Sequence, residues 1–230
     1  MHTWDFDRSN IHKMEILLIS YKGILTKIHF AFQRPCVQFF YEGGHMILAG
    51  IDYSLTGPAI CVFEGDVFCY DNCTFYFLTD VKKHTELIYP NIFAERFIDW
   101  NQEMERYKSI ADWAIEILIG VDAIALEGYA YGATGRVFSL AENTGVLKYK
   151  IYELGKPLTI FTPSEVKKHF SGKGNADKNA MHDAFIKKTA VDLRAVISPN
   201  KMDITSPVSD LVDSYAICRM LHEQMVLSQY

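Results

Sequence analysis

The sequence predicts an α/β protein in which helices flank a mixed β-sheet. Strand patterns and helical patterns alternate along the chain, as expected for a layered α/β fold. Of its 230 residues, 49% are hydrophobic and 22% charged, which is enough apolar material for one sizeable core. No internal repeat or low-complexity linker interrupts residues 46–230, so we expect them to form one domain.

Residues 1–45 differ from the rest of the chain. They are rich in aromatic side chains and histidines but show no sustained hydrophobic period. The pattern changes abruptly at Gly43-Gly44-His45-Met46, where an apolar strand pattern begins. We therefore expect residues 1–45 to be a dispensable N-terminal extension, either disordered or translated from upstream of a true start at Met46.

The first part of the domain predicts an antiparallel meander. The stretch M-I-L-A-G-I-D-Y-S-L from Met46 is typical of a buried strand, and Gly57-Pro58 ends it. Residues 59–64 and 67–77 then predict two strands joined by a tight turn at Gly65-Asp66.

The rest of the domain predicts helices alternating with two further strands. We expect a long helix after Pro90 through Phe93 and Phe97 to Ile119, then a strand V-D-A-I-A-L-E at 121–127 and a glycine-rich loop. A helix at 137–154 and a strand at 158–161 should follow. The chain should end with a brief helix that opens at Thr162-Pro163-Ser164-Glu165, a helix to about Thr189 and a last helix around Asp210. The expected sheet therefore has five strands.

Composition favours a cytoplasmic protein with no membrane partner. No apolar run reaches the ~20 residues of a membrane helix, and the N-terminus lacks the regions of a secretory signal. Five cysteines without framework spacing agree with a reducing compartment. Cys61, Cys69 and Cys73 with His84 are an alternative zinc site, although no C-x-x-C pair is present; small apolar strand residues are the other interpretation.

The net charge of −5 hides a basic segment. Residues 148–188 contain nine lysines and four acids, a local net charge of +5. Lysines beside an acidic site suit a metal-dependent enzyme that acts on a polyanion, although a solvated lysine-rich face has the same composition.

Two acids lie three residues apart in the last predicted helix, within S-D-L-V-D-S-Y-A-I. Side chains at this spacing share one side of a helix, so Asp210 and Asp213 project together and repel each other. A divalent cation would remove the repulsion. Alternatively, this is an ordinary helix N-terminus in which Ser209 or Asp210 is the cap.

Two further acids end apolar strands. Asp52 lies toward the end of the first strand, and Glu127 ends the strand after the long helix. Right-handed crossovers return the chain beside its start, so these strands should be parallel neighbours whose carboxyl ends meet. An acid in an apolar strand is costly unless it is paired or binds metal. We therefore expect four carboxylates to converge on a cation site.

These motifs resemble the RuvC family of Holliday junction resolvases, in the ribonuclease H-like nuclease superfamily. The resemblance covers residues 46 to about 225 and rests on A-G-I-D-Y-S-L-T-G-P-A, A-L-E-G-Y, A-D-K-N-A and D-L-V-D-S-Y-A-I. It implies a three-layer ribonuclease H-like fold with a mixed five-stranded sheet. Residues 1–45 have no family counterpart, and the loop Y-A-Y-G-A-T-G-R is more similar to compact, phage-encoded members, which would act in the cytoplasm of the bacterial host.

The resemblance implies a site and a reaction. Asp52, Glu127, Asp210 and Asp213 would be catalytic metal ligands, and Lys178 would be the catalytic lysine near the scissile phosphate. The implied cofactor is Mg²⁺, two ions about 3.5–4 Å apart, with Mn²⁺ able to substitute. Hydrolysis would give 5′-phosphate ends, and a homodimer would place paired symmetric nicks in a four-way junction.

The expected DNA contacts are Tyr129, Tyr131, Arg136, Lys148, Lys173 and Lys178. The tyrosines would stack on unpaired bases at a junction centre, although packing of their loop onto the domain would also explain them. The helix at 137–154 has more apolar side chains than one core-facing stripe uses. It predicts either the shared face of a dimer or a fully buried central helix.

Three rival functions stay open on the sequence. A nuclease that debranches replication forks or flaps would have the same motifs. An actin-like ATPase or sugar kinase has a similar first loop to G-I-D-Y-S-L-T-G, but such proteins duplicate the fold and carry a second glycine-rich phosphate motif. A noncatalytic binder of branched DNA would have no need of four acids.

Overall fold

The computed structural model describes residues 18–19, 25–26, 46–86, 89–129 and 137–228. The chain divides into two compact units, residues 1–45 and 46–230. In the first unit, the short strands β1 (Leu18–Ile19) and β2 (Leu25–Thr26) pair antiparallel. All other elements belong to the second unit.

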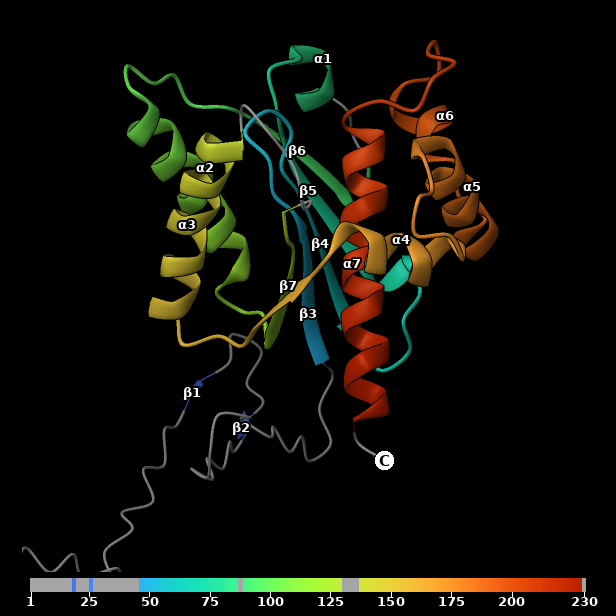
Figure 1. Ribbon diagram of the computed structural model, residues 1–230, viewed down its shortest axis with the longest axis horizontal. Helices are drawn as coiled ribbons and strands as arrows, with labels where there is room; N and C mark the ends of the chain where they lie inside the picture. The colour runs from blue at the N-terminus through green and yellow to red at the C-terminus, as the bar shows by residue number, and fades with distance from the viewer. Residues whose placement is uncertain (1–17, 20–24, 27–45, 87–88, 130–136, 229–230) are drawn as a thin grey trace, which may run out of the picture. The chain divides into compact units, whose positions relative to one another are not determined.

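A six-stranded mixed sheet forms the centre of the second unit (Figure 1). In spatial order the strands are β6 (Ile92–Arg96), β5 (Cys73–Thr79), β4 (Ala59–Gly65), β3 (Met46–Asp52), β7 (Ala123–Glu127) and β8 (Leu158–Phe161). Strand β4 is antiparallel to both of its neighbours, and the other neighbouring pairs are parallel. Every strand except β4 therefore ends at the same edge of the sheet.

Helices cover both faces of the sheet, which confirms the predicted three-layer α/β architecture (Figure 1). On one face lie α2 (Glu103–Leu118) and α3 (Val137–Glu153). The other face is covered by α7 (Val208–Leu227), with α4 (Pro163–Ser171), α5 (Lys178–Thr189) and α6 (Leu193–Ile197) packed against it. None of the helices in the described ranges has both the length and the apolar character needed to span a bilayer.

Strand β3 and helix α7 meet backbone to backbone at Gly50. A Cβ atom added there would lie 2.2 Å from the nitrogen of Cys218 and 2.4 Å from the carbonyl oxygen of Ser214. Next to this contact, the Cys218 thiol donates to the carbonyl oxygen of Leu48 at 3.5 Å. Only glycine leaves room for a helix at this distance, which explains the glycine inside an otherwise apolar strand.

The sheet has six strands, not the predicted five, because residues 92–96 form β6. The sequence prediction placed them in a helix, since Phe93 and Phe97 fit helical spacing. In the structure β6 pairs with β5, and the ring of Phe93 stacks on that of Tyr76 with centroids 5.5 Å apart. Helix α2 begins only at Glu103. Pairing with a neighbouring strand outweighs local periodicity here.

The connection between β4 and β5 is also longer than the predicted tight turn at Gly65-Asp66. Strand β5 begins at Cys73, and a short 3-10 helix, η1 (Tyr70–Asn72), precedes it. The ring of Phe68 packs 5.1 Å from that of Tyr215 on α7. Aromatic residues that resemble a strand in the sequence therefore leave the sheet and extend the core on the α7 side.

Substituting Gly50 by alanine tests the β3–α7 contact. Because the added methyl would meet backbone atoms that cannot rotate away, we expect a loss of more than about 3 kcal/mol in the free energy of unfolding, measured by urea denaturation. Gly145 in α3 is the matched control, since no atom lies within 4 Å of its added Cβ. Gly145→Ala should gain about 0.5–1 kcal/mol. Equal stability of Gly50→Ala and the unsubstituted chain would contradict the close approach.

Candidate active site

Asp52 and Glu127 lie side by side at the carboxyl ends of β3 and β7. Leu48 of β3 and Ala125 of β7 belong to the core on the α7 side. Side chains two residues apart in a strand share a face, so Asp52 and Glu127 also point toward α7. The parallel register pairs Ile51 with Leu126, and the next position along brings the two acids together.

Asp210 and Asp213 enter the site from the first two turns of α7. They stand on one side of the helix, and all four acids are partly buried. Burial raises the pKa of Asp52 well above its usual range, and the negative charges of Asp210, Asp213 and Glu127 raise it further. The structure therefore brings the four predicted acids within electrostatic reach of one another.

The pKa values of Asp213 and Glu127 are raised as well. Burial, followed by the charges of Glu127 and Asp210, raises the pKa of Asp213 to about 7. Burial also raises the pKa of Glu127, while the positive charge of Lys167 opposes the shift. Carboxyl groups this strongly perturbed at one edge of a sheet are typical of functional sites.

Asp210 is held by two serines. The Ser206 hydroxyl donates to its Oδ2 at 2.5 Å, and the Ser209 hydroxyl donates to its Oδ1 at 2.8 Å. Neither Ser209 nor Asp210 caps the helix, because Pro207 occupies that position and makes no side-chain cap bond. Asp210 does lie in the first turn, as in an ordinary helix N-terminus. The β3–β4 loop packs on the same carboxylate, since a Cβ at Gly57 would lie 2.8 Å from Oδ2.

The donor set suits a hard divalent cation, which prefers carboxylate oxygens. Within the described ranges, no three His, Cys, Asp or Glu side chains stand close enough together to hold an ion. The raised pKa values of Asp52 and Asp213 reflect mutual repulsion as well as burial, and a cation would relieve that repulsion.

The alternative zinc site is not formed. Cys61 and Cys73 are buried strand residues, and the Cys73 thiol donates to the carbonyl oxygen of Cys69 at 3.2 Å. The ring of His84 instead lies 3.2 Å from the hydroxyl of Thr79.

Two lysines flank the acids. The Lys178 ammonium, at the start of α5, donates to the Ser209 hydroxyl at 3.3 Å, and its charge lowers the pKa of Asp52 and Asp213. Lys167 of α4 acts on Glu127 and Asp213 in the same direction. A small pocket adjoins them. Its lining residues are Lys167, Asp177, Lys178, Met181, Ser209, Val212 and Asp213.

Lys167 was not among the predicted site residues. The signal was present, because Thr162 and Glu165 form a capping box that starts α4 directly after β8. Phe161 of β8 pairs with Glu127, so the start of α4 is held beside that acid. Identifying Lys167 also required knowing that β8 lies next to β7.

The structure describes four of the six predicted DNA-contact residues. The Tyr129 hydroxyl donates to the carbonyl oxygen of Ala141 at 3.3 Å, and the Lys148 ammonium lies 5.2 Å from the centroid of its ring. Tyr129 thus packs against two residues of α3, which favours the loop-packing interpretation for this tyrosine. Lys173 is exposed between α4 and α5. Tyr131 and Arg136 lie outside the described residues.

Comparison with known proteins finds similarity to crossover junction endodeoxyribonucleases. No family model matches the chain. The crossover junction endodeoxyribonuclease RuvC of Corynebacterium glutamicum is 40% identical over 75 residues, which cover 32% of this chain and 33% of that protein. The RuvC of Helicobacter hepaticus is 34% identical over 93 residues, 40% of this chain and 48% of that protein. The matched stretches span about a third to a half of these relatives.

Among solved structures, Thermus thermophilus RuvC in complex with a Holliday junction substrate matches with a TM-score of 0.52 and 18% identity, over 80% of this chain and 96% of that chain. The chain resembles the RuvC resolvases. The sequence motifs therefore predicted the correct relatives, and the structural match confirms the ribonuclease H-like fold. The RuvC-like unit also contains β6, which the motifs did not predict.

The raised pKa of Asp213 predicts how stability changes with pH. The unfolded chain loses this proton near 3.8 and the folded chain near 7, so the folded state holds more protons between these values. Its stability must therefore fall as the pH rises from about 4 to about 7. Asp213→Asn should flatten this dependence in the presence of EDTA and raise the melting temperature at pH 7.5 by a few degrees, at ~2–4 °C per kcal/mol.

Calorimetry between pH 5 and pH 8 measures this effect. Asp99→Asn, at an exposed position in the loop before α2, is the control and should leave the pH dependence unchanged. A melting temperature of Asp213→Asn that falls with pH as steeply as that of the unsubstituted chain would count against the charge crowding.

Proposed function

We propose that this chain is a divalent-metal-dependent endodeoxyribonuclease that resolves four-way DNA junctions. The observation that carries the proposal is the gathering of Asp52, Glu127, Asp210 and Asp213 at one sheet edge, where the pKa values of the first, second and fourth are raised and two lysines stand alongside. Acids that bind cations and lysines that bind phosphate both stabilise the charge that develops during attack on a phosphodiester. The likeness to RuvC resolvases supports the same function.

The four acids would hold Mg²⁺, with Mn²⁺ as a substitute. The bound metal would activate a water and stabilise the leaving 3′-oxygen. Lys178 and Lys167 line the pocket beside Asp213, where their charges would bind the scissile phosphate and offset the charge that accumulates on it. Ser206 and Ser209 fix the orientation of the Asp210 carboxylate.

Conservative substitution of the acids tests this site. Asp52→Asn, Glu127→Gln and Asp213→Asn should each reduce Mg²⁺-dependent cleavage of a four-way junction by at least about 100-fold, because the cation loses a charged ligand. Binding of the same junction should stay equal or tighten, because repulsion of phosphate falls. Glu116→Gln, an exposed change on α2, is the control and should cleave normally. Normal cleavage by any one of the three would remove that acid from the site.

The outer face of α3 supports a homodimer. Leu147 and Ile151 are buried in the core, but Phe138, Tyr149 and Tyr152 are 76%, 61% and 79% exposed. The interpretation of this helix as fully buried is therefore wrong. Two copies related by a two-fold axis could pair these aromatic side chains and present two active sites, as two matched nicks require.

Tyr152→Glu tests the dimer. A charge on the proposed shared face should shift the chain toward monomer in light scattering, because burying it in an interface is costly. On a cruciform plasmid we expect single nicks in place of paired ones. Val67→Glu introduces the same charge at another exposed apolar position and should change neither result. An unchanged dimer in Tyr152→Glu would mean that another surface mediates association.

The rival functions give different outcomes in the same assays. Cleavage of forks or flaps in preference to four-way junctions would favour a debranching nuclease of the same fold. Binding of branched DNA without cleavage at any Mg²⁺ or Mn²⁺ concentration would favour a noncatalytic binder. An actin-like kinase would need a second copy of the fold, and the described residues contain one such sheet.

A further inference from the structure

Lys178 and Asp210 are joined through a buried serine. The Lys178 ammonium donates to the Ser209 hydroxyl at 3.3 Å, and that hydroxyl donates to Asp210 Oδ1 at 2.8 Å. Ser209 itself is 3% exposed. One side chain therefore links the lysine that would bind the scissile phosphate to an acid that would hold the cation. Both groups can act on the same phosphate only if the distance between them is right.

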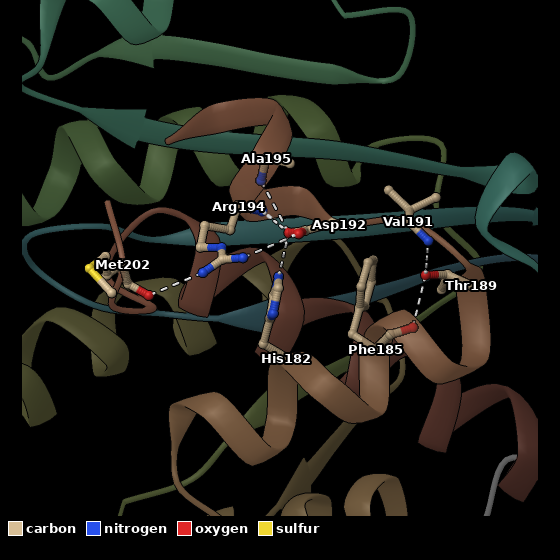
Figure 2. A network of polar contacts seen from close by, with 8 residues as sticks. All are labelled: His182, Phe185, Thr189, Val191, Asp192, Arg194, Ala195 and Met202. Atoms are coloured by element: carbon tan, nitrogen blue, oxygen red, sulfur yellow. Dashed lines mark hydrogen bonds and ion pairs between the residues drawn. The ribbon is translucent and has the colours of Figure 1, made fainter. Parts of the chain in front are cut away.

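The helix that carries Lys178 is held at a second point on the same face (Figure 2). His182 lies four residues after Lys178, so both side chains project from one side of α5. His182 is 3% exposed, and its Nε2 lies 3.3 Å from Asp192 Oδ1, with no other hydrogen-bond partner in the described part of the chain. A buried polar atom with one available partner is costly to separate from it. The contact therefore holds α5 against the start of α6.

Asp192 connects α5 to the loop that precedes α7. It caps α6 by accepting from the backbone N–H groups of Arg194 and Ala195 at 2.9 and 3.1 Å. The Arg194 guanidinium lies 3.6 Å from Asp192 Oδ2 and donates to the carbonyl oxygen of Met202 at 3.2 Å (Figure 2). Asp192 thus lies between the histidine of α5 and the backbone of residues 198–207.

Residues 198–207 lead back to the acids of the candidate site. The N–H of Lys201 donates to the carbonyl oxygen of Ser198 at 2.9 Å, which braces the loop. Near its end, the Ser206 hydroxyl donates to Asp210 Oδ2 at 2.5 Å. The contacts therefore close a ring, which runs from Lys178 through Ser209, Asp210, Ser206, Met202, Arg194, Asp192 and His182 back to α5.

We propose that Asp192 is a positioning residue that sets the distance between Lys178 and Asp210. It contacts His182 on one side and Arg194 on the other, so its removal opens the ring at two contacts. Supporting groups of this kind orient the side chains that carry out a reaction without touching the substrate. The inference rests on the proposed nuclease function, in which Lys178 binds the scissile phosphate.

Asp192→Ala tests the ring. With the junction bound to saturating protein and Mg²⁺ present, the single-turnover cleavage rate should fall roughly ten-fold, because Lys178 is no longer held beside the phosphate. The affinity for the same junction in EDTA should change less than about two-fold, since the other phosphate contacts remain. In a Lys178→Ala chain, Asp192→Ala should have no further effect on the rate, because the group that it positions is gone.

Asp112→Ala is the matched control. Asp112 also joins two helices, through Lys108 at 2.5 Å and Lys150 at 2.7 Å, but on the other face of the sheet. Its loss should lower the melting temperature and leave the cleavage rate unchanged. Arg194→Met opens the ring but leaves the cap of α6 in place. It replaces Asp192→Ala if that chain does not fold, and it should give the same loss of rate.

The outcomes separate this inference from the proposed function. Cleavage at the normal rate by Asp192→Ala or Arg194→Met overturns the positioning role and leaves the nuclease proposal intact. A loss of the same size in the Lys178→Ala background also overturns it, because Asp192 would then act on something other than Lys178. An unsubstituted chain that does not cut branched DNA overturns both.

Discussion

The backbone contact between Gly50 and α7 is the constraint on which the geometry of the site depends. It lets α7 lie directly on β3, because the backbone of Ser214 and Cys218 occupies the space that a side chain at position 50 would need. Asp52 lies two residues beyond Gly50, and Asp213 lies directly before Ser214. Each acid is therefore within about one helical turn or one strand pleat of the contact. Gly50, a small residue in the core, therefore helps to position Asp52 and Asp213 at the sheet edge.

The four acids of the candidate site lower the stability of the folded chain. Four carboxyl groups are partly withdrawn from water and repel one another, which disfavours the folded chain when the groups are ionised. The apolar side of α7 offsets this cost, since Leu211, Val212 and Tyr215 are almost completely buried against the sheet. Strained or repulsive arrangements of this kind persist at functional sites because the surrounding core stabilises them.

The sequence predicted that the four acids would come close together, because the signals are local and independent of one another. Apolar strands that end in Asp52 and Glu127, and a helix with Asp210 and Asp213 on one side, can be recognised without knowing the sheet order. The errors came from long-range effects. Strand β6 exists because β5 offers it a partner, and Lys167 reaches the acids only because β8 lies beside β7. The exposure of Tyr149 and Tyr152 likewise depends on where α3 packs, which periodicity alone leaves ambiguous.

The order of the acids along the chain has a consequence for biosynthesis. Asp52 and Glu127 are translated early, but α7 brings the other two and covers one face of the sheet, in contact with β3, β4, β5 and β7. A nascent chain that has not yet reached residue 208 therefore lacks two of the four acids and leaves one face of the sheet uncovered. If the chain is a nuclease, it stays inert on the ribosome until the same helix that closes the fold also completes the site.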